Sequence, residues 1–234
     1  MTKRWFITGT DTDVGKTVAS CALLQAAAQQ GYRTAGYKPV ASGSQMTPDG
    51  LRNSDALALQ ANSSAALSYS QVNPLTFLEA TSPHIASEGL EIDLSILSQG
   101  LQQLEHSAEW ILVEGAGGWF TPLSPQATFA DWVLREQLPV IMVVGIKLGC
   151  INHALLTALA IRQAGLKLVG WIANEVIPAG GRQVEYMATL TQMISAPRLG
   201  VVPYLTDLDV YPITQRRDLG GYLDLGLLAE VPLS

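Results

Sequence analysis

The sequence has little charge, few cysteines and no long apolar run, and each of these absences excludes a class of protein. Only 15% of the 234 residues are charged and the net charge is −6, so no basic stripe is available to neutralise the phosphates of a nucleic acid. Cys21 and Cys150 form no paired motif, which excludes a disulfide framework or a zinc site. No stretch offers the ~18 apolar residues of a membrane span, and the N-terminus has no signal-peptide pattern. These features predict a soluble, cytoplasmic protein without a membrane or nucleic-acid partner.

The composition is that of a globular protein. Apolar residues make up 48% of the chain, which is enough to bury a substantial core at this length. No internal repeat, low-complexity tract or linker interrupts the sequence, and α/β domains longer than the usual ~150 residues are often single. We therefore expect one domain spanning residues 1–234, in which the polar, loop-rich stretch 41–92 is an insertion beside the site.

Short apolar runs alternate with helical patterns along the chain. Several runs are continuously apolar, which is typical of strands buried on both faces of a parallel sheet. Strands are predicted at residues 5–8, 34–37, 110–113, 139–144, 168–173 and 200–203. Helices are predicted at 17–30, after Asp93, at 152–164 and at 182–194, with Gly31 and Gly165 closing the first and third of them. This alternation favours an α/β fold with a doubly wound, mostly parallel sheet.

The most informative segment is Gly9-Thr-Asp-Thr-Asp-Val-Gly15-Lys16-Thr17. It follows the first apolar run and precedes a helical pattern, which is the context of a phosphate-binding loop, or P-loop. Backbone N–H groups of such a loop and the helix N-terminus hold phosphate oxygens. Lys16 is placed to reach the outer phosphates and the Thr17 hydroxyl to bind Mg²⁺. These features together favour a P-loop over a glycine-rich turn that merely caps a helix, although five residues rather than the usual four separate Gly9 from Gly15.

Polar residues follow the apolar runs. Lys38, Glu114, Lys147 and Asn174 each come shortly after a predicted strand. Ligands of doubly wound sheets bind beyond the C-terminal ends of the strands. These side chains are therefore expected to lie at the same edge of the sheet as the P-loop.

Three oxygen-bearing residues are candidates for holding Mg²⁺, which prefers oxygen ligands and takes few carboxylates besides phosphate and water. They are Thr17, Glu114 and Asp55. A carboxylate after a wholly apolar strand is costly unless it is paired, which strengthens the case for Glu114. Asp55 has two interpretations that local sequence does not separate, a metal ligand or an ordinary helix N-cap.

Two other segments also keep two interpretations. Lys38 is either a surface-edge residue or a second cation over the site, and Ser42 and Ser44 behind it are candidate hydrogen-bond donors. The segment 147–152 is either a loop or the start of a helix whose free N–H groups bind a carboxylate.

Together these motifs resemble those of the dethiobiotin synthetases, over nearly the whole chain. The five-residue loop spacing is the one that this family uses, and the set of segments is more specific than the loop alone. The matching segments are 9–17, Gly36-Tyr-Lys-Pro-Val-Ala-Ser-Gly43, Asn53-Ser-Asp55, Thr81-Ser-Pro-His84, Val113-Glu-Gly-Ala-Gly-Gly-Trp119 and Lys147-Leu-Gly-Cys-Ile-Asn-His153.

The resemblance implies an ATP- and Mg²⁺-dependent cyclo-ligase of biotin biosynthesis with a P-loop fold. The expected substrates are 7,8-diaminononanoate, CO₂ and ATP, and the expected products are dethiobiotin, ADP and phosphate. The family reaction passes through a carbamate and a carbamic–phosphoric anhydride. The resemblance also implies a homodimer with the substrate site near the subunit interface.

The resemblance assigns roles to individual residues. Lys16 and Lys38 are expected to be catalytic, and Thr17, Asp55 and Glu114 to bind Mg²⁺. The expected nucleotide-binding residues are Asp13, Val14, Gly15, Lys16, Thr17, Val18, Asp55, Glu114, Gly115, Ala116, Gly117, Asn174, Glu175, Pro203, Tyr204 and Leu205, with Asn174 reading adenine. The expected substrate-binding residues, besides Lys38, are Thr12 and Ser42 at the carbamate end and, across the dimer interface, Asn152 and Tyr186 at the carboxylate end.

Two features depart from the family pattern. Asp13 stands where the family often has Glu, which keeps the charge and shortens the reach. The tail from Thr206 onward, including Arg216 and Arg217, is less similar to the family, so a nucleotide contact there is not expected from the resemblance.

Two other classes of protein fit the sequence less well than this family does. Cell-division and chromosome-partition ATPases share the sheet and the loop, but they usually carry a signature lysine early in the loop, where this chain has Thr10 and Asp11. Cobyrinate-type amidotransferases carry a glutamine-hydrolysing domain with a nucleophilic cysteine. This chain is too short for such a domain, and neither of its cysteines lies in a nucleophile-elbow pattern.

Overall fold

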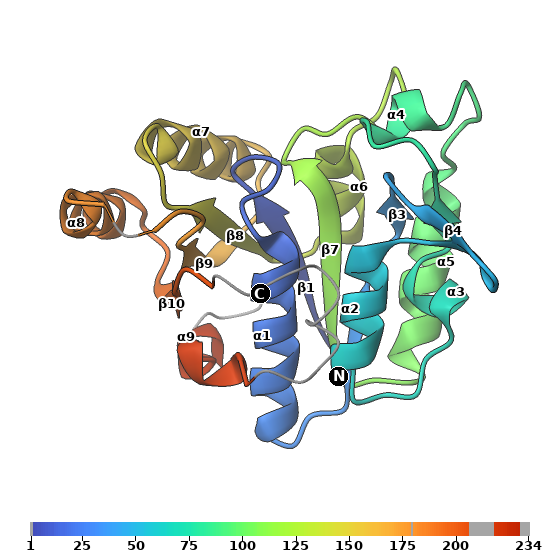
Figure 1. Cartoon of the computed structure of the whole chain (residues 1–234), viewed down its shortest axis with the longest axis horizontal. Helices are drawn as coiled ribbons and strands as arrows, with labels where there is room; N and C mark the ends of the chain where they lie inside the picture. Colours follow the sequence, from blue (N-terminus) through green and yellow to red (C-terminus); the bar gives the residue numbers. More distant parts are fainter. Residues whose placement is uncertain (1, 179, 206–217, 230–234) are drawn as a thin grey trace.

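The central element is a six-stranded parallel sheet with the strand order β10-β9-β8-β1-β7-β2. The structure is a computed structural model, which describes residues 2–178, 180–205 and 218–229. The strands of the sheet are β1 (Lys3–Gly9), β2 (Thr34–Tyr37), β7 (Trp110–Gly118), β8 (Val140–Gly145), β9 (Leu168–Asn174) and β10 (Arg198–Val202). All six predicted strands are confirmed, and β1 lies between β7 and β8 at the centre (Figure 1).

Helices cover both faces of this sheet, as the apolar strands require. One face packs against α1 (Lys16–Gln29), α2 (Ser54–Asn62) and α9 (Gly226–Ala229). The other face packs against α5 (Leu94–Glu105), α6 (Phe129–Glu136), α7 (Cys150–Gln163) and α8 (Gln183–Met193). Neighbouring residues such as Phe6 and Ile7 point into different core clusters, and both are buried. The continuous apolar runs therefore reflect a sheet that is covered on both sides.

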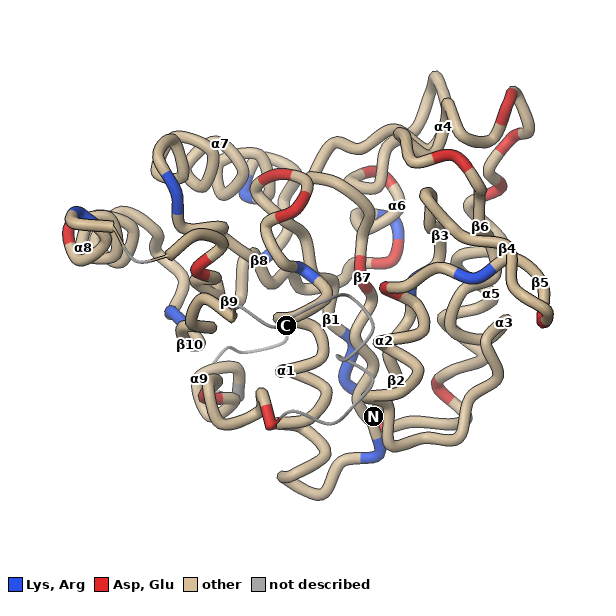
Figure 2. The backbone as a smooth tube through the Cα atoms, in the orientation of Figure 1, with Lys and Arg blue, Asp and Glu red and all other residues tan. Residues whose placement is uncertain are grey.

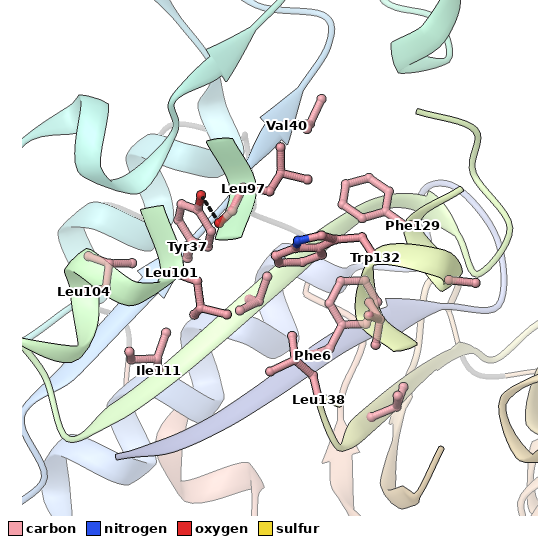
Figure 3. Close-up of a cluster of buried hydrophobic side chains, with 14 of the residues drawn as sticks. Phe6, Tyr37, Val40, Leu97, Leu101, Leu104, Ile111, Phe129, Trp132 and Leu138 are labelled. Carbon is pink, nitrogen blue, oxygen red and sulfur yellow. Dashed lines mark hydrogen bonds between the residues drawn. The ribbon is translucent and has the colours of Figure 1, made fainter. Parts of the chain in front are cut away.

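Aromatic side chains fill the core between β1, β7 and the helices α5 and α6. The Phe6 ring centroid lies 6.0 Å from that of Phe129 and 6.5 Å from that of Trp132 (Figure 3). The buried Tyr37 hydroxyl donates a 3.0 Å hydrogen bond to the Leu97 carbonyl, which satisfies its polar end. This packing fixes β1 and β7, the two strands that lead into the P-loop and Glu114.

Residues 41–92 form short elements along the β2 edge of the sheet rather than a plain loop. Two pairs of strands are present, one parallel (β3 with β6) and one antiparallel (β4 with β5). The elements are β3 (Val40–Ala41), β4 (Gln45–Thr47), β5 (Gly50–Arg52), α2, α3 (Tyr69–Val72), β6 (Leu75–Thr76) and α4 (Pro83–Ala86). Because α2 and α3 pack against β2, this segment forms one wall beside the strand ends (Figure 1).

Most predicted helices are present within two residues of their expected ends, but α6 was missed. Its signal is a capping box: the Thr128 hydroxyl and the Asp131 carboxylate each bind the other's backbone N–H. Gly31 and Gly165 follow α1 and α7 with φ of 90° and 76°, the left-handed conformation expected at these helix ends.

Charge is spread thinly over the described part of the chain. Lys and Arg are scattered along the tube and form no continuous stripe in the segments shown in colour (Figure 2). Within the described residues, the search for a helix both long and apolar enough to span a bilayer finds no candidate.

Candidate active site

The P-loop, residues 9–17, joins β1 to α1 and is shaped by its glycines. Gly15 is the N-cap of α1 and has φ of 80°, a left-handed conformation that favours glycine. A Cβ at Gly15 would collide with the Asn174 amide, and one at Gly9 would lie 2.7 Å from the Asp11 carbonyl oxygen. No side chain caps α1, so the N–H groups of its first turn are available to an anion.

Asn174 braces this loop from the neighbouring strand β9. Its Nδ2 donates a 2.9 Å hydrogen bond to the Val14 carbonyl, and its side chain is buried. Val14 is itself buried against Gly145 at the end of β8. The residue expected to read adenine therefore also fixes the shape of the P-loop.

A cavity of about 1000 Å³ lies over the loop at the C-terminal edge of the sheet. It is lined by four parts of the chain that are distant in sequence, as expected for a ligand site on a doubly wound sheet. Its walls include residues 10–13 and 15–18 of the P-loop and α1, Lys38, Ser42, Gly43, Asn53–Asp55, Ala80–Pro83, Ala116–Gly118 and Thr121.

Lys38 joins the two candidate metal-binding carboxylates. Its Nζ lies 2.7 Å from Glu114 Oε1 and 3.1 Å from Asp55 Oδ2, and it also donates to the Gly115 carbonyl at 3.2 Å. The Thr17 hydroxyl donates to the same Glu114 oxygen at 3.0 Å. Lys38 is only 3% exposed and Glu114 is completely buried, so the surface-edge interpretation of Lys38 was wrong.

The N-cap interpretation of Asp55 was also wrong. Asn53 is the N-cap of α2, and its Oδ1 accepts from the backbone N–H groups of Asp55 and Ala56 at 3.0 and 3.2 Å. Because Asn53 caps the helix, the Asp55 carboxylate is directed to Lys38 instead. The local sequence indicated that a helix starts near Asp55, but it did not identify Asn53 as the residue that caps this helix.

Ser20 belongs to this cluster and was missed in the sequence. Its hydroxyl donates a 2.7 Å hydrogen bond to Glu114 Oε2, and both residues are completely buried. Ser20 lies three residues after Thr17 on α1, so the two hydroxyls share one face of the helix. A serine one turn beyond a P-loop threonine was the only available signal.

Burial and neighbouring charges shift the pKa values of the two lysines in opposite directions. Burial, and next the positive charge of Lys38, lower the pKa of Lys16 against the opposing effect of Glu114, Asp55 and Asp13, with a net value of about 8. Burial also acts to lower the pKa of Lys38, but the carboxylates of Glu114 and Asp55 outweigh it and raise that pKa above its ordinary value.

Asp55 is held as a carboxylate by the same contacts. Burial alone acts to raise its pKa, but Lys38, a hydrogen bond with Thr17 and the charge of Lys16 together lower it. The cavity is therefore lined by two lysine side chains and the ionised Asp55 carboxylate.

Thr12, Ser42 and the segment 80–83 form another part of the cavity wall. Ser42 Oγ, just after β3, donates a 2.6 Å hydrogen bond to the Thr81 carbonyl, which joins two distant parts of the insertion. Ser44 instead shares a hydrogen bond with Thr76. Ser42 and Thr12 thus lie on the cavity wall, whereas Ser44 serves the insertion itself.

The expected nucleotide-binding residues beyond the P-loop lie at neighbouring strand ends. Val202 of β10 pairs in register with Asn174 of β9, so Pro203–Leu205 follow beside the loop that Asn174 braces. The Glu175 carboxylate accepts from the Tyr204 N–H at 3.3 Å. Ala116 and Gly117 line the cavity with the P-loop residues. Thr206 and the pair Arg216–Arg217 lie outside the described residues.

Asn152 and Tyr186 are not brought to this cavity within one chain. Asn152 is exposed near the start of α7, and Tyr186 lies half-buried on α8. Both helices stand on the opposite side of the molecule from α2 and α4 (Figure 1). The segment before Asn152 is a helix start with Gly149 as its N-cap, so the loop interpretation of 147–152 was only partly right.

These features define a P-loop nucleotide-binding protein. The loop joins a central parallel strand to its helix and carries a lysine and a hydroxyl, and a buried carboxylate comes from the neighbouring strand. The family model described as "AAA domain" matches residues 3–210. Among solved structures, the fold is similar to the MinC:MinD cell division protein complex of Aquifex aeolicus (TM-score 0.56, 17% identity, covering 99% of this chain and 98% of that one). It is also similar to a ParA family ATPase of Chlorobium tepidum TLS (TM-score 0.57, 12% identity, covering 99% of this chain and 100% of that one). At these identities the likeness concerns the fold alone.

Sequence relatives narrow this class to one family. A protein of Yersinia pestis bv. Antiqua named ATP-dependent dethiobiotin synthetase BioD is 80% identical over 230 residues, covering 97% of this chain and 96% of the relative. ATP-dependent dethiobiotin synthetase BioD 1 of Escherichia coli K12 is 65% identical over 230 residues, covering 97% and 100%. The chain belongs to the ATP-dependent dethiobiotin synthetase family.

Proposed function

We propose that this protein is an ATP-dependent cyclo-ligase of biotin biosynthesis that converts 7,8-diaminononanoate and CO₂ to dethiobiotin. The observation that carries the proposal is that Lys16, Lys38 and Asp55 line one cavity, with Lys38 paired to the Asp55 carboxylate and to the buried Glu114 carboxylate behind it. The near-full-length relatives that bear this name support the substrate and the reaction. Since ATP, its cosubstrate, is made inside the cell, we place the enzyme in the cytoplasm.

The reaction couples bond formation at a carboxyl carbon to phosphoryl transfer. One neutral amine of the diamine adds to CO₂ and loses a proton, which gives a carbamate. A carbamate oxygen attacks the γ-phosphorus of ATP, the bond to the β-phosphate oxygen breaks, and ADP leaves. The second amine then attacks the carbamoyl carbon and loses a proton, phosphate leaves with the electron pair of the broken C–O bond, and the five-membered urea ring closes. Ring closure needs mainly orientation, because both amines belong to one bound molecule.

The two lysines favour the neutral amine and the anionic species along this route. Alkyl amines have pKa values of roughly 10, and the like charges of Lys16 and Lys38 disfavour an ammonium form of the substrate beside them. The same charges stabilise the carbamate and the transferring phosphoryl group. Lys16 and the N-terminus of α1 hold the phosphates, while Lys38, Thr12 and Ser42 hold the carbamate end.

Thr17, Asp55 and Glu114 are the residues that would hold Mg²⁺. Their donor atoms are all oxygens, which Mg²⁺ prefers. Both carboxylates already share one cation, the Lys38 ammonium, so their oxygens face a common point. Among the described residues there is no group of three or more His, Cys, Asp or Glu side chains around a common point; two carboxylates with a hydroxyl fit an ion that is also bound by phosphates and water. When bound, Mg²⁺ neutralises phosphate charge and aligns the phosphoryl group.

Asn174 and the residues near it are proposed to hold the adenine base. A primary amide has two N–H donors and a carbonyl acceptor, so the hydrogen bond to Val14 leaves Asn174 with capacity for a base edge. Glu175 and Pro203–Leu205 lie beside it at the ends of β9 and β10.

We further propose a homodimer formed through α7 and α8. Leu148 and Leu156 are 86% and 57% exposed, and Val184 on α8 is 80% exposed. Asn152 and Leu156 are four residues apart on α7, so they share one face of the helix, and Leu148 lies just before its N-cap Gly149. A dimer through this surface would bury the exposed leucines and would bring Asn152 and Tyr186 toward the partner's substrate.

The proposal is tested by phosphate release from ATP in the presence of Mg²⁺ and bicarbonate. Phosphate release is expected to require 7,8-diaminononanoate and to accompany dethiobiotin formation, measured by mass spectrometry. A nonanoate with one amine, which cannot close the ring, is the matched control and should yield no cyclic product. Phosphate release at the same rate without the diamine would contradict the proposed function.

A further inference from the structure

The buried serine on α1 stands beside the proposed metal site without being part of it. We propose that Ser20 is a positioning residue that holds the Glu114 carboxylate in the orientation needed to bind the divalent cation. This inference rests on the metal assignment made above for Thr17, Asp55 and Glu114. It concerns how one of these ligands is kept in place.

The two oxygens of Glu114 have different partners. Oε1 accepts from Lys38 at 2.7 Å and from Thr17 at 3.0 Å. Oε2 accepts from Ser20 at 2.7 Å. One carboxylate oxygen therefore faces Lys38 and Thr17, which line the cavity, and the other faces Ser20 on the buried side of α1.

The donors to Oε1 must change partners when ligands bind, whereas Ser20 need not. Lys38 is assigned to the carbamate and Thr17 to the cation, so both must redirect their polar atoms when ligands bind. Ser20 is completely buried and has no place among the cavity-lining residues that the structure describes. Its hydrogen bond to Oε2 can thus persist when ligands occupy the cavity.

Losing this hydrogen bond should act on metal binding more than on folding. Partners that orient a metal ligand typically change metal affinity or activity 10- to 100-fold when they are removed. Without Ser20, a carboxylate that must also exchange its Lys38 and Thr17 contacts has no remaining anchor within the described residues.

The chain offers a matched control for a purely structural role. Ser98 on α5 is also buried, and its hydroxyl donates a 2.5 Å hydrogen bond to Glu136 and accepts from Trp132. Ser98→Ala therefore removes a buried serine–glutamate hydrogen bond that lies away from the cavity. If Ser20 serves stability alone, Ser20→Ala and Ser98→Ala should behave alike.

The experiment measures the binding of Mn²⁺ to the ADP complex by electron paramagnetic resonance, without turnover. Ser20→Ala is expected to weaken Mn²⁺ affinity about 10-fold or more, while ADP affinity in the presence of EDTA stays within about twofold of the wild type. Ser98→Ala should leave both affinities unchanged. If Ser20→Ala does not fold, Ser20→Cys keeps the size with a weak donor and should shift Mn²⁺ affinity in the same direction.

Two outcomes overturn the inference while leaving the metal assignment intact. One is wild-type Mn²⁺ affinity in the Ser20 variant, and the other is an equal loss in the Ser98 variant. Absence of Mn²⁺ binding by the wild-type ADP complex would be distinguishable from both, because it would overturn the metal assignment and the inference together.

Discussion

Two neighbouring loops of this protein both lead into a helix through a left-handed glycine, but the residues around the two glycines differ. The P-loop joins β1 to α1, and the second loop, residues 146–149, joins the adjacent strand β8 to α7. Each ends in a left-handed glycine that is the N-cap of its helix, Gly15 with φ of 80° and Gly149 with φ of 92°, and neither helix has a side-chain cap. Each therefore presents free helical N–H groups at the same edge of the sheet.

The two loops differ in how deeply their residues are buried. Gly15 packs directly under the Asn174 amide, whereas a Cβ at Gly149 would meet nothing within 4 Å. Lys16 is 8% exposed among charged neighbours, whereas Leu148 in the second loop is 86% exposed. The loops touch through a partly exposed ion pair between Lys147 and Asp11 at 3.5 Å. The buried neighbours of the α1 N-terminus make it a candidate phosphate site. The exposed N-terminus of α7 fits the proposed contact with a partner subunit better.

The largest expected difference between the loops is in nucleotide binding. Lys16→Met should weaken ATP affinity and lower kcat/KM about 10³-fold or more, because a buried cation aimed at the phosphates is lost. Lys147→Met should change kcat/KM less than about threefold at saturating diamine, since its ion pair with Asp11 is partly exposed and weak. Isothermal titration with ATP and steady-state kinetics measure both. Similar losses in the two variants would show that the loops are not functionally distinct.

The second largest difference is expected in the stability cost of replacing the two N-cap glycines, Gly15 and Gly149, with alanine. Gly149→Ala should cost about 1–2 kcal/mol of unfolding free energy, the strain of a left-handed alanine in open space. Gly15→Ala should cost more, about 3 kcal/mol, because its Cβ also displaces Asn174, and it should distort ATP binding. Urea denaturation of the two variants gives the comparison. Equal costs would mean that Asn174 does not brace the P-loop.

The exposed leucine of the second loop tests the partner role. Leu148→Asp is expected to shift a dimer toward monomer by at least 10-fold in dissociation constant, because a charge would be buried in an apolar interface. Met46→Asp is the matched control: Met46 is 74% exposed on β4, away from α7, and its substitution should leave the dimer unchanged. Sedimentation equilibrium measures both variants. A wild-type protein that is monomeric at all concentrations would contradict the proposed dimer.

The smallest expected effect is a pH dependence of stability from Lys16. Its folded pKa is lowered to about 8 from 10.5, mainly by burial and next by the charge of Lys38. Between pH 8 and 10.5 the unfolded chain therefore binds more protons at this residue, so its contribution to stability rises with pH, and its full cost is present below pH 8. Lys16→Met should stabilise the ligand-free protein at pH 7 by about 1–3 kcal/mol, with the gain shrinking toward pH 10. A destabilised variant at pH 7 would show that the burial of this ammonium carries no cost.

The sequence predicted the parts of the fold and site that depend on regular patterns. Continuous apolar runs identified the parallel strands, and the rule that ligands bind beyond strand ends correctly predicted that Lys38 and Glu114 lie beside the P-loop. The roles of these residues remain predictions, but their convergence is a property of the fold.

Features that depend on a single contact were not predictable. Ser20 and Glu114 are 94 positions apart, and the position of Ser20 one turn after Thr17 does not by itself reveal that its partner is a carboxylate on another element. The helix α6 has only eight residues, too few for periodicity to separate it from a loop. Asp55 was ambiguous because its role depends on whether Asn53 takes the cap, which is decided by geometry.

The central claim is that Lys38 serves the migrating phosphoryl group and carbamate, whereas Lys16 anchors the nucleotide. The most direct measurement is Lys38→Ala, with kcat from diamine-dependent phosphate release and ATP affinity from titration on the same folded sample. A fall in kcat of about 10²- to 10³-fold with ATP affinity within about threefold of the wild type is predicted. Loss of ATP affinity, or an unchanged kcat, would contradict the account.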